Sequence, residues 1–368
     1  MKTHRLLFVA LGLCLISALS WAGSVTGIVF LDDNANGARE EGEAGIAGVQ
    51  VSDGFTLVRT NAEGAYSLTS PEGYLVVRVT NPTGYWFSGP FWKGFESTGE
   101  PVEADFALIK QDQSLPLTFA DMTDIHVNDK GFPRFQEFIT RLNAQEPAPA
   151  FVIATGDLVM DVLGAKTPEQ VDHLYGQYET ATADLKLRLF NLPGNHEHVG
   201  WNSDFDRAHP WFGKGAYQRK LGPLYYSFNY GPYRLLLLDA TTQNPDGGYF
   251  EEITPDCMAW LEQELAATPK DSFLVVFVHE PLYGLRNRFD LGKLLTRDHK
   301  VVACFSGHTH NRDHYYFFGA KAEGAGAVSG SWWNGPSPDG TPEGCLLVTL
   351  KEQGIVDWTF LEGFPASD

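Results

Sequence analysis

The feature of this sequence that most restricts its fold is a set of five apolar runs, each followed by polar side chains that bind metal ions in many proteins. The runs comprise residues 115–120, 151–154, 187–192, 273–278 and 301–305. From about Ser114 they alternate with amphipathic, helix-like segments, which predicts a layered α/β domain. In open α/β sheets the loops beyond the carboxyl ends of the strands meet in one crevice. We therefore expect the five polar endings to lie close together.

The side chains at these endings are carboxylates, imidazoles and one amide. In chain order they are Asp124, His126, Asp157, Asn195, His196, His279, His308 and His310. A single histidine among apolar residues is usually a buried residue with a satisfied hydrogen bond, but here every ending would need its own partner. A shared metal centre satisfies all of them together. A ligand set without thiolates suits Mn, Fe, Zn or Co, and glycines at 156, 194 and 307 let the backbone approach closely.

These endings form a recurring set of motifs. They are Asp124-x-His126, Gly156-Asp157, Gly194-Asn195-His196-Glu197, His279 and Gly307-His308-x-His310. Over residues 114–361 the chain resembles the calcineurin-like metallophosphoesterase superfamily, and residues 222–228 are similar to bacterial members that carry an N-terminal β-sandwich. The resemblance implies an α/β fold of four layers, in which two packed mixed sheets are flanked by helices. It also implies a hydrolase that acts on phosphoric ester bonds.

The resemblance assigns a role to each polar ending. One metal would be held by Asp124, His126, Asp157 and His310. The other would be held by Asp157, Asn195, His279 and His308, so that the Asp157 carboxylate bridges the two ions. Two such ions clamp both the attacking and the leaving oxygen of an in-line displacement, with a metal-bridging hydroxide as the nucleophile. His196 would stabilise the transition-state charge or protonate the leaving oxygen.

Other residues near the motifs have two interpretations each. Phosphatase-like members of the superfamily carry an acid that orients the catalytic histidine, one position before Asp161; Asp161 either replaces that acid or is an ordinary loop residue. Arg286 and Arg288 either contact the substrate phosphate, for which arginine is well suited, or are solvated loop charges. Trp332 and Trp333 either line the pocket or cover a sheet edge.

Residues 23–110 differ in texture from residues 111–368, which we assign to the catalytic domain. They are rich in Gly, Val, Thr and Tyr, with short β-like stretches separated by turn signals, and this predicts a small all-β sandwich domain. One loop fits the calcium pattern D-x-[DN]-x-[DN]-G-x5-E. Its ligands would be Asp32, Asn34, Asn36 and Glu43. The loop resembles those of B-type calcium-binding modules, and residues 48–68 resemble carboxypeptidase regulatory-like domains; a turn without metal is the alternative of equal weight.

The first 22 residues predict a signal peptide. Lys2 and Arg5 precede an apolar run at 6–19 that ends in small residues, and the run is shorter than a membrane span. We therefore expect a periplasmic or secreted protein without a membrane span after signal removal. The formal net charge of −19 argues against nucleic acid as a partner. Three cysteines remain after residue 22, and their apolar surroundings predict buried, unpaired side chains.

Two functional classes stay open on the sequence. The favoured one is an exported phosphoesterase that hydrolyses small phosphomonoesters or phosphodiesters with two divalent metals. The alternative is a catalytically weak surface or carbohydrate-binding protein that uses a phosphoesterase-like scaffold. The complete ligand set favours the enzyme.

Overall fold

The computed structural model describes residues 21–97 and 100–364 of the 368-residue chain. The predicted signal peptide thus lies outside the described residues except for its last two positions. Those two begin strand β1 (Trp21–Leu31), which starts ahead of the expected mature terminus at residue 23. None of the helices in the described ranges has the length and apolar character that crossing a membrane requires.

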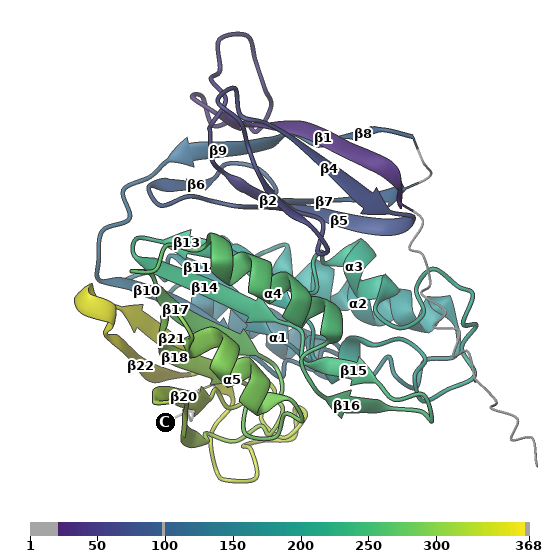
Figure 1. Cartoon of the computed structure of the whole chain (residues 1–368). Coiled ribbons are helices and arrows are strands. Elements are labelled where there is room, and N and C mark those ends of the chain that lie inside the picture. Colours follow the sequence, from purple (N-terminus) through teal and green to yellow (C-terminus); the bar gives the residue numbers. More distant parts are fainter. Residues whose placement is uncertain (1–20, 98–99, 365–368) are drawn as a thin grey trace, which may run out of the picture.

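The N-terminal region is built from two small sheets that face each other (Figure 1). One sheet has the order β4-β1-β9-β6, with β8 beside β1, and the other has the order β3-β2-β5-β7. Their strands are β2 (Gln50–Ser52), β3 (Leu57–Arg59), β4 (Ala65–Pro71), β5 (Gly73–Thr80), β6 (Tyr85–Phe87), β7 (Trp92–Ser97), β8 (Val102–Glu103) and β9 (Phe106–Lys110). Val29, Val51, Val77 and Leu108 are fully buried between the sheets. The predicted strand-rich sandwich is confirmed.

The turn before β4 shows why the sequence folds this way locally. The Asn61 side chain accepts hydrogen bonds from the amides of Glu63 and Ala65, at 3.0 and 2.8 Å. Gly64 has a φ of +77°, and a Cβ there would lie 2.4 Å from the carbonyl oxygen of Val29. Only glycine fits this close approach in the left-handed conformation.

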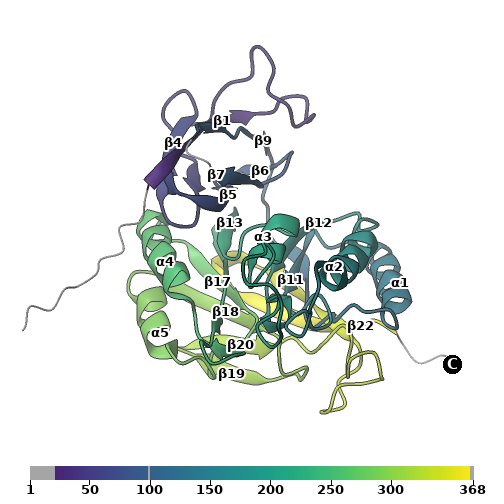
Figure 2. The same cartoon turned by 90° about the vertical axis from the view of Figure 1, so that its right-hand side faces the viewer.

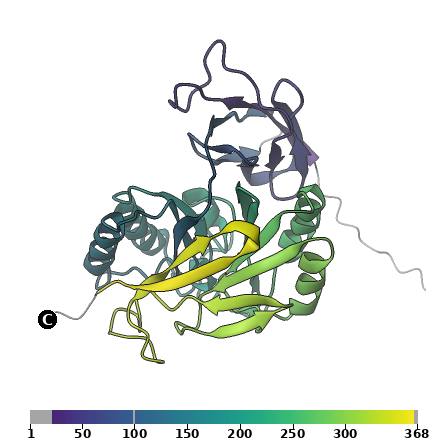
Figure 3. The ribbon, with the colours of Figure 1, turned by 90° about the vertical axis from the view of Figure 1, so that its left-hand side faces the viewer.

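The rest of the chain forms two larger mixed sheets. The first has the order β12-β11-β10-β21-β22, and the second has the order β13-β14-β17-β18-β20-β19. The strands of the first are β10 (Leu117–Met122), β11 (Phe151–Thr155), β12 (Arg188–Leu192), β21 (Gly344–Leu350) and β22 (Val356–Glu362). Those of the second are β13 (Tyr226–Tyr230), β14 (Tyr233–Leu238), β17 (Phe273–Val278), β18 (Lys300–Ser306), β19 (His314–Phe317) and β20 (Ala320–Gly324). The C-terminal hairpin β21–β22, yellow in Figure 3, completes the first sheet.

Helices cover the outer face of each sheet. They are α1 (Phe132–Asn143), α2 (Pro168–Thr182), α3 (Gly215–Lys220), α4 (Pro255–Ala267) and α5 (Arg288–Thr296), with short 3₁₀ turns η1 (Asn195–Glu197) and η2 (Glu352–Gly354) and a separate hairpin of β15 (Thr241–Gln243) and β16 (Tyr249–Glu251). Both α2 and α4 begin with a threonine side chain that accepts an amide hydrogen bond, followed by proline. In Figure 2, α1 and α2 lie on one side of the sheets and α4 and α5 on the other.

Alternation along the strands decides which layer each side chain enters. Phe119 and Ile153 belong to the core between the two sheets, whereas their neighbours Ala120 and Ala154 pack toward α1 and α2. Because both faces are covered, these strands read as continuous apolar runs. The predicted four-layer α/β fold is confirmed.

The N-terminal sheets dock on the edge of this layered region through aromatic packing. Trp86 of β6 lies 5.6 Å from the ring of Phe151 and 6.0 Å from that of Phe228. Through such contacts one apolar cluster runs from the N-terminal sheets into the space between the larger sheets. The two regions therefore share a continuous core.

Buried polar contacts reinforce this docking. Arg234 of β14 pairs with Glu264 of α4, and both are shielded from solvent. Gln50 of β2 joins the pair by accepting from Arg234 at 2.9 Å and donating to Glu264 at 3.4 Å. Asn81 and Asn229 exchange three further hydrogen bonds across the boundary.

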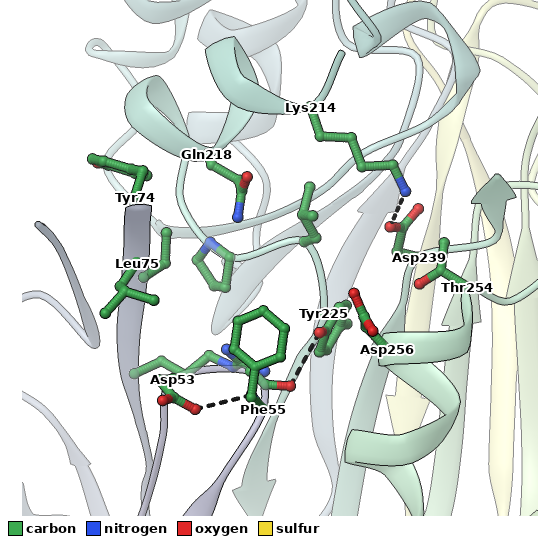
Figure 4. Close-up of a pocket in the computed structure, with 15 residues that line it drawn as sticks. Asp53, Phe55, Tyr74, Leu75, Lys214, Gln218, Tyr225, Asp239, Thr254 and Asp256 are labelled. Carbon is green, nitrogen blue, oxygen red and sulfur yellow. Dashed lines mark hydrogen bonds and ion pairs between the residues drawn. The ribbon is translucent and has the colours of Figure 1, made fainter. Parts of the chain in front are cut away.

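A cleft of about 310 Å³ lies beside these contacts, between the N-terminal sheets and helices α3 and α4 (Figure 4). One of its lining residues is the buried Arg78, whose guanidinium lies 5.0 Å from the Tyr225 ring centroid and 5.3 Å from that of Trp260. Tyr225 also donates to the carbonyl of Gly54 at 3.1 Å. Aromatic faces thus hold a cation of the N-terminal region against the layered region.

The cysteines follow the sequence prediction. Cys257, Cys304 and Cys345 are buried and unpaired. Burial raises the pKa of Cys304 above the usual range of a thiol, so the group stays protonated and behaves as a small apolar side chain.

Candidate metal centre

The polar strand endings converge at one edge of the two packed sheets. They follow β10, β11 and β12 of the first sheet and β17 and β18 of the second. In the described part of the chain, three groups of side chains have potential ligand atoms that all lie within 4.8 Å of one another. The groups are Asp124, His126 and His310; Asp157, His279 and His308; and His126, Asp157 and His196. The structure therefore brings together residues that are up to 186 positions apart, the span from Asp124 to His310.

The first group forms a compact cluster of three buried side chains. His310 Nε2 lies 3.4 Å from Asp124 Oδ1 and 2.9 Å from His126 Nε2. His126 Nε2 lies 3.8 Å from Asp124 Oδ1. Three ligand atoms thus point at one small volume.

The second group lies against the first. Asp157 Oδ2 is 3.1 Å from His279 Nε2, and His308 Nδ1 is 2.9 Å from Asn195 Oδ1. The same Asp157 oxygen is 3.6 Å from His126 Nε2 of the first group. Asp157 therefore lies between the two groups, with one oxygen facing a histidine of each.

The hydrogen bonds of the imidazoles fit a metal centre. His279 Nδ1 lies 2.9 Å from the carbonyl oxygen of Thr155, and His310 Nδ1 lies 2.5 Å from that of Gly330. In the neutral imidazole each carbonyl favours the Nδ1–H tautomer, which would leave a lone pair on Nε2 for a metal. His279 Nε2 is buried without a hydrogen-bond partner among the described residues. A buried, unpaired nitrogen that faces a carboxylate is what a divalent cation would satisfy.

The carboxylates are held in their charged form. Burial opposes the charge of Asp157, but the adjacent His279 and His196 outweigh that effect and hold the pKa of Asp157 well below its usual value. Burial likewise opposes the charge of Asp124, while His310 and His126 lower its pKa below the ordinary value. Both side chains are therefore anionic ligands at neutral pH.

The backbone at the centre is strained. Five of the ligand residues have φ between +46° and +70°, the left-handed region that side chains other than glycine rarely adopt. They are Asp124, His126, Asp157, His308 and His310. Each such residue costs about 1–3 kcal/mol and persists only where the surroundings fix it.

The glycines beside the ligands permit this crowding. A Cβ on Gly156, whose φ is +83°, would lie 2.5 Å from His279 Nδ1. A Cβ on Gly194 would lie 2.3 Å from Asp157 Oδ1, and one on Gly307 would lie 2.4 Å from Asp124 Oδ2. The expected close approach of the backbone at these three positions is confirmed.

Glu197 has a positional role that the sequence did not reveal. Its fully buried carboxylate accepts hydrogen bonds from the amides of Gly194, Asp157, Leu158 and Val159, at 2.6 to 3.1 Å. It thereby ties the turn after β11 to the turn after β12. Glu197 is the last residue of the Gly194–Glu197 motif, so the sequence marked its position. Only the fold shows which amides donate to its carboxylate.

His196 lies at the edge of the centre, with 20% of its side chain exposed. Its Nε2 is 3.9 Å from Asp157 Oδ2, and its ring is 4.6 Å from the His126 ring. Its backbone amide donates to Asp157 Oδ1 at 2.9 Å. The backbone of His196 is thus held at the centre, and its side chain lies near the ligands with partial access to solvent.

Among the described residues no hydrogen bond joins Asp161 to His196, and the orienting role of Asp161 stays a prediction. His196 Nδ1 has no hydrogen-bond partner among the described residues. Asp161 is exposed and lines a cavity with Gln170 and His173 of α2. The alternative, an ordinary loop acid, agrees with this placement.

The two arginines of the loop after β17 lie in different environments. Arg286 lies 3.4 Å from the Phe250 ring centroid and lines a cleft of about 350 Å³ with Glu251. Glu251 Oε1 is 3.5 Å from His308 Nε2, so this cleft adjoins the second ligand group. Arg288 instead starts α5 and donates to the carbonyl of Leu285 at 3.1 Å, so the structure gives it no position at the centre.

The calcium-like loop lies in the N-terminal region, and its side-chain oxygens are already used. Asp32 accepts from the amides of Asn36 and Gly37, at 3.1 and 2.7 Å. Asn34 accepts from the amide of Asn36, and Glu43 accepts from two loop amides. Gly37 has a φ of +76°, as the pattern requires. Calcium binding here stays a prediction.

Comparison with known proteins agrees with this geometry. The family described as calcineurin-like phosphoesterase matches residues 117–312, and the family described as the N terminal of calcineurin-like phosphoesterase matches residues 33–111. A 3',5'-cyclic-nucleotide phosphodiesterase of Nostoc is 26% identical over 216 residues, which cover 54% of this chain and 73% of that protein. A cAMP/cGMP dual specificity phosphodiesterase of Mycobacterium tuberculosis is 26% identical over 237 residues, which cover 61% and 70%. Among solved structures, GAP50, the anchor in the inner membrane complex of Plasmodium, superposes with a TM-score of 0.45 at 16% identity over 69% of this chain and 87% of that one.

Proposed function

Because the chain belongs to the calcineurin-like phosphoesterase family and is thus a hydrolase of phosphoric ester bonds, we propose that it is an exported two-metal enzyme that hydrolyses small phosphodiesters, and phosphomonoesters more slowly. The position of Asp157 carries this proposal. A single carboxylate oxygen lies 3.1 Å from a histidine of one ligand group and 3.6 Å from a histidine of the other. That spacing suits two ions that share one carboxylate.

The ligands would hold two divalent metals such as Mn, Fe, Zn or Co, which neutralise the phosphate and supply a nucleophile near neutral pH. The side chains of this protein position the reaction. Asp157 keeps the two ligand groups in register, and Glu197 holds its turn. His196 lies beside the ligands with partial access to solvent, which suits donation of a proton from its imidazole to the leaving oxygen.

The preference for diesters is supported by the two relatives, since both are named as phosphodiesterases. Cyclic nucleotides are therefore among the substrates we propose to test. Arg286, beside the second ligand group, is a candidate contact for the phosphate or the group that it carries. The alternative of a binding protein with a weak site has no observation in its favour, because no ligand position is missing.

The test is hydrolysis of bis-p-nitrophenyl phosphate, p-nitrophenyl phosphate and 3',5'-cyclic AMP by the full chain with added Mn²⁺. We expect turnover of at least one diester, and unchanged turnover in Arg288→Ala, the matched control whose side chain lies outside the centre. A protein that contains two metals per chain by elemental analysis and hydrolyses none of these compounds would refute the proposal.

Export and calcium have separate tests. Export is proposed from residues 1–22 and is checked by the N-terminal sequence of protein from the periplasm or the medium; intact residues 1–22 there would contradict a cleaved signal.

Calcium binding is checked by calorimetry of the full chain already loaded with Mn²⁺. Heat that disappears in Glu43→Gln supports a site, and no heat at millimolar calcium excludes it.

A further inference from the structure

The loop of residues 329–335, between β20 and β21, is fastened to the first ligand group. The backbone amide and the hydroxyl of Ser329 both donate to the carbonyl oxygen of Asp124, at 3.2 and 2.7 Å. The next carbonyl, that of Gly330, accepts from His310 Nδ1 at 2.5 Å. The loop therefore cannot move without moving two ligands.

Trp333 fastens the same loop to a third ligand. Its indole is buried, and Nε1 donates to the carbonyl oxygen of His126 at 3.1 Å. The indole lies against Gly131, where a Cβ would come within 2.2 Å of Nε1. Trp333 is thus enclosed on the protein side of the loop and has a structural role.

Trp332 lies on the same loop with the opposite environment. Among the tryptophans whose burial the structure describes, it alone is exposed, with 45% of its surface accessible. Its ring centroid is 4.8 Å from that of His310 and 6.1 Å from that of His126. Its φ is +48° and that of Trp333 is +63°, so two bulky residues in succession hold a rare conformation. The fastened loop keeps a large aromatic face in solvent beside the ligands.

The proposed proton donor lies beside the same ligand. The His126 ring is 4.6 Å from His196 and 6.1 Å from Trp332, so both side chains adjoin His126. Glu251 instead lies beside His308 of the second group, and Arg286 lines the same cleft as Glu251. The proposed proton donor and the exposed indole are thus both neighbours of His126, within reach of one substrate bound at the first ligand group.

We propose that Trp332 is the platform on which a planar group of the substrate stacks, and that the substrates are phosphodiesters that carry a nucleobase or an aryl group. This inference rests on the proposed function. An indole offers a broad rigid face, and stacking on it tolerates any base because every base has a π-face. The rigid loop lowers the cost of ordering the platform on binding.

The test compares three diesters: 3',5'-cyclic AMP with a nucleobase, bis-p-nitrophenyl phosphate with an aryl group, and glycerophosphoethanolamine with neither. In Trp332→Ala we expect kcat/KM to fall roughly 5- to 150-fold for a planar substrate, the effect of losing one stacking contact. For the aliphatic diester we expect no change. A loss with cyclic AMP alone assigns the face to a nucleobase, and a loss with the aryl ester alone assigns it to an aryl group.

Two further variants separate stacking from structure. Trp332→Phe keeps an aromatic face and should retain most of the preference for planar substrates. Tyr316→Ala removes an exposed aromatic side chain of the edge strand β19 and should change nothing. Metal content by elemental analysis should equal that of the unsubstituted chain in all three. An equal loss on all three diesters in Trp332→Ala, or loss of metal in it, overturns the inference.

Binding can be tested without turnover, which keeps the two proposals apart. An unsubstituted chain that hydrolyses none of the diesters contradicts the proposed function. Calorimetry with adenosine 5'-monophosphate then decides on Trp332: weaker binding to Trp332→Ala than to Trp332→Phe supports the platform, and equal binding to both overturns it.

Discussion

The two regions of this protein each carry a loop rich in metal-binding residue types, but the side chains are used differently. In the N-terminal loop, Asp32 accepts hydrogen bonds from the amides of its own loop. At the edge of the large sheets, one oxygen of Asp157 accepts an amide while the other faces imidazoles from distant segments. His279 Nε2 there faces the Asp157 carboxylate and has no hydrogen-bond partner in the described part of the chain. The residue types predict a metal site in both loops. Only the loops at the sheet edge contain a buried ligand atom without a hydrogen bond, and this distinguishes the two sites.

The regions are also joined more closely than two independent modules would be. Gln50 enters a buried ion pair of the layered region, and Trp86 packs among its aromatic rings. The boundaries 23–110 and 111–368 stay predictions. We expect the two regions to unfold together, because separation would expose the apolar cluster that runs through both.

The largest expected effect comes from one of two matched substitutions of aspartate by asparagine, one in each loop. Asp157→Asn should lower kcat/KM for a diester on the order of 10⁴-fold, because the loss of a shared ligand removes several kcal/mol of transition-state stabilisation. Asp32→Asn, the matched change in the N-terminal loop, should leave turnover unchanged. Steady-state kinetics and elemental analysis measure both. A similar fall of kcat/KM in the two variants would contradict the assignment of turnover to the Asp157 loop alone.

The second effect tests the joint between the regions. Glu264→Ala leaves Arg234 buried without a counter-charge and should lower the free energy of unfolding by about 3–5 kcal/mol. Lys270→Ala removes a solvent-exposed pair with Asp298 and should have no measurable effect. Denaturant unfolding, followed by tryptophan fluorescence and by circular dichroism, measures the change. Two separate transitions in the unsubstituted chain would contradict a single cooperative unit.

The smallest effect is a pH dependence that originates beneath the metal centre. Burial raises the pKa of Asp121 to about 7, while Thr155 donates to it. The folded chain thus holds a proton that the unfolded chain releases near pH 4, so stability is fully present below that pH and falls as pH rises toward 7. The slope is on the order of 1 kcal/mol per pH unit. Asp121→Asn should remove it between pH 5 and 7, as measured by chemical denaturation; an identical slope in the variant would contradict this assignment.

Much of the fold was predictable because it rests on local patterns. The apolar runs at 151–154 and 273–278 became β11 and β17 almost without change, since both faces of these strands are covered. The turn at Asn61 and Gly64 was equally predictable, because its hydrogen bonds are made within five residues. The docking by Gln50 and Arg78 was not, since their partners lie more than 140 positions away in the sequence.

The sequence by itself determined that carboxylates and imidazoles would gather at one sheet edge, because strand polarity alone brings those loops together. Only the tertiary structure decided the direction of each side chain. Asp161 lines a cavity with residues of α2, whereas Glu197 fixes two turns. Trp332 and Trp333 are neighbours with opposite exposure. The physical reason is that these loops adopt left-handed backbone conformations that distant contacts impose, and no local pattern in the sequence encodes those contacts.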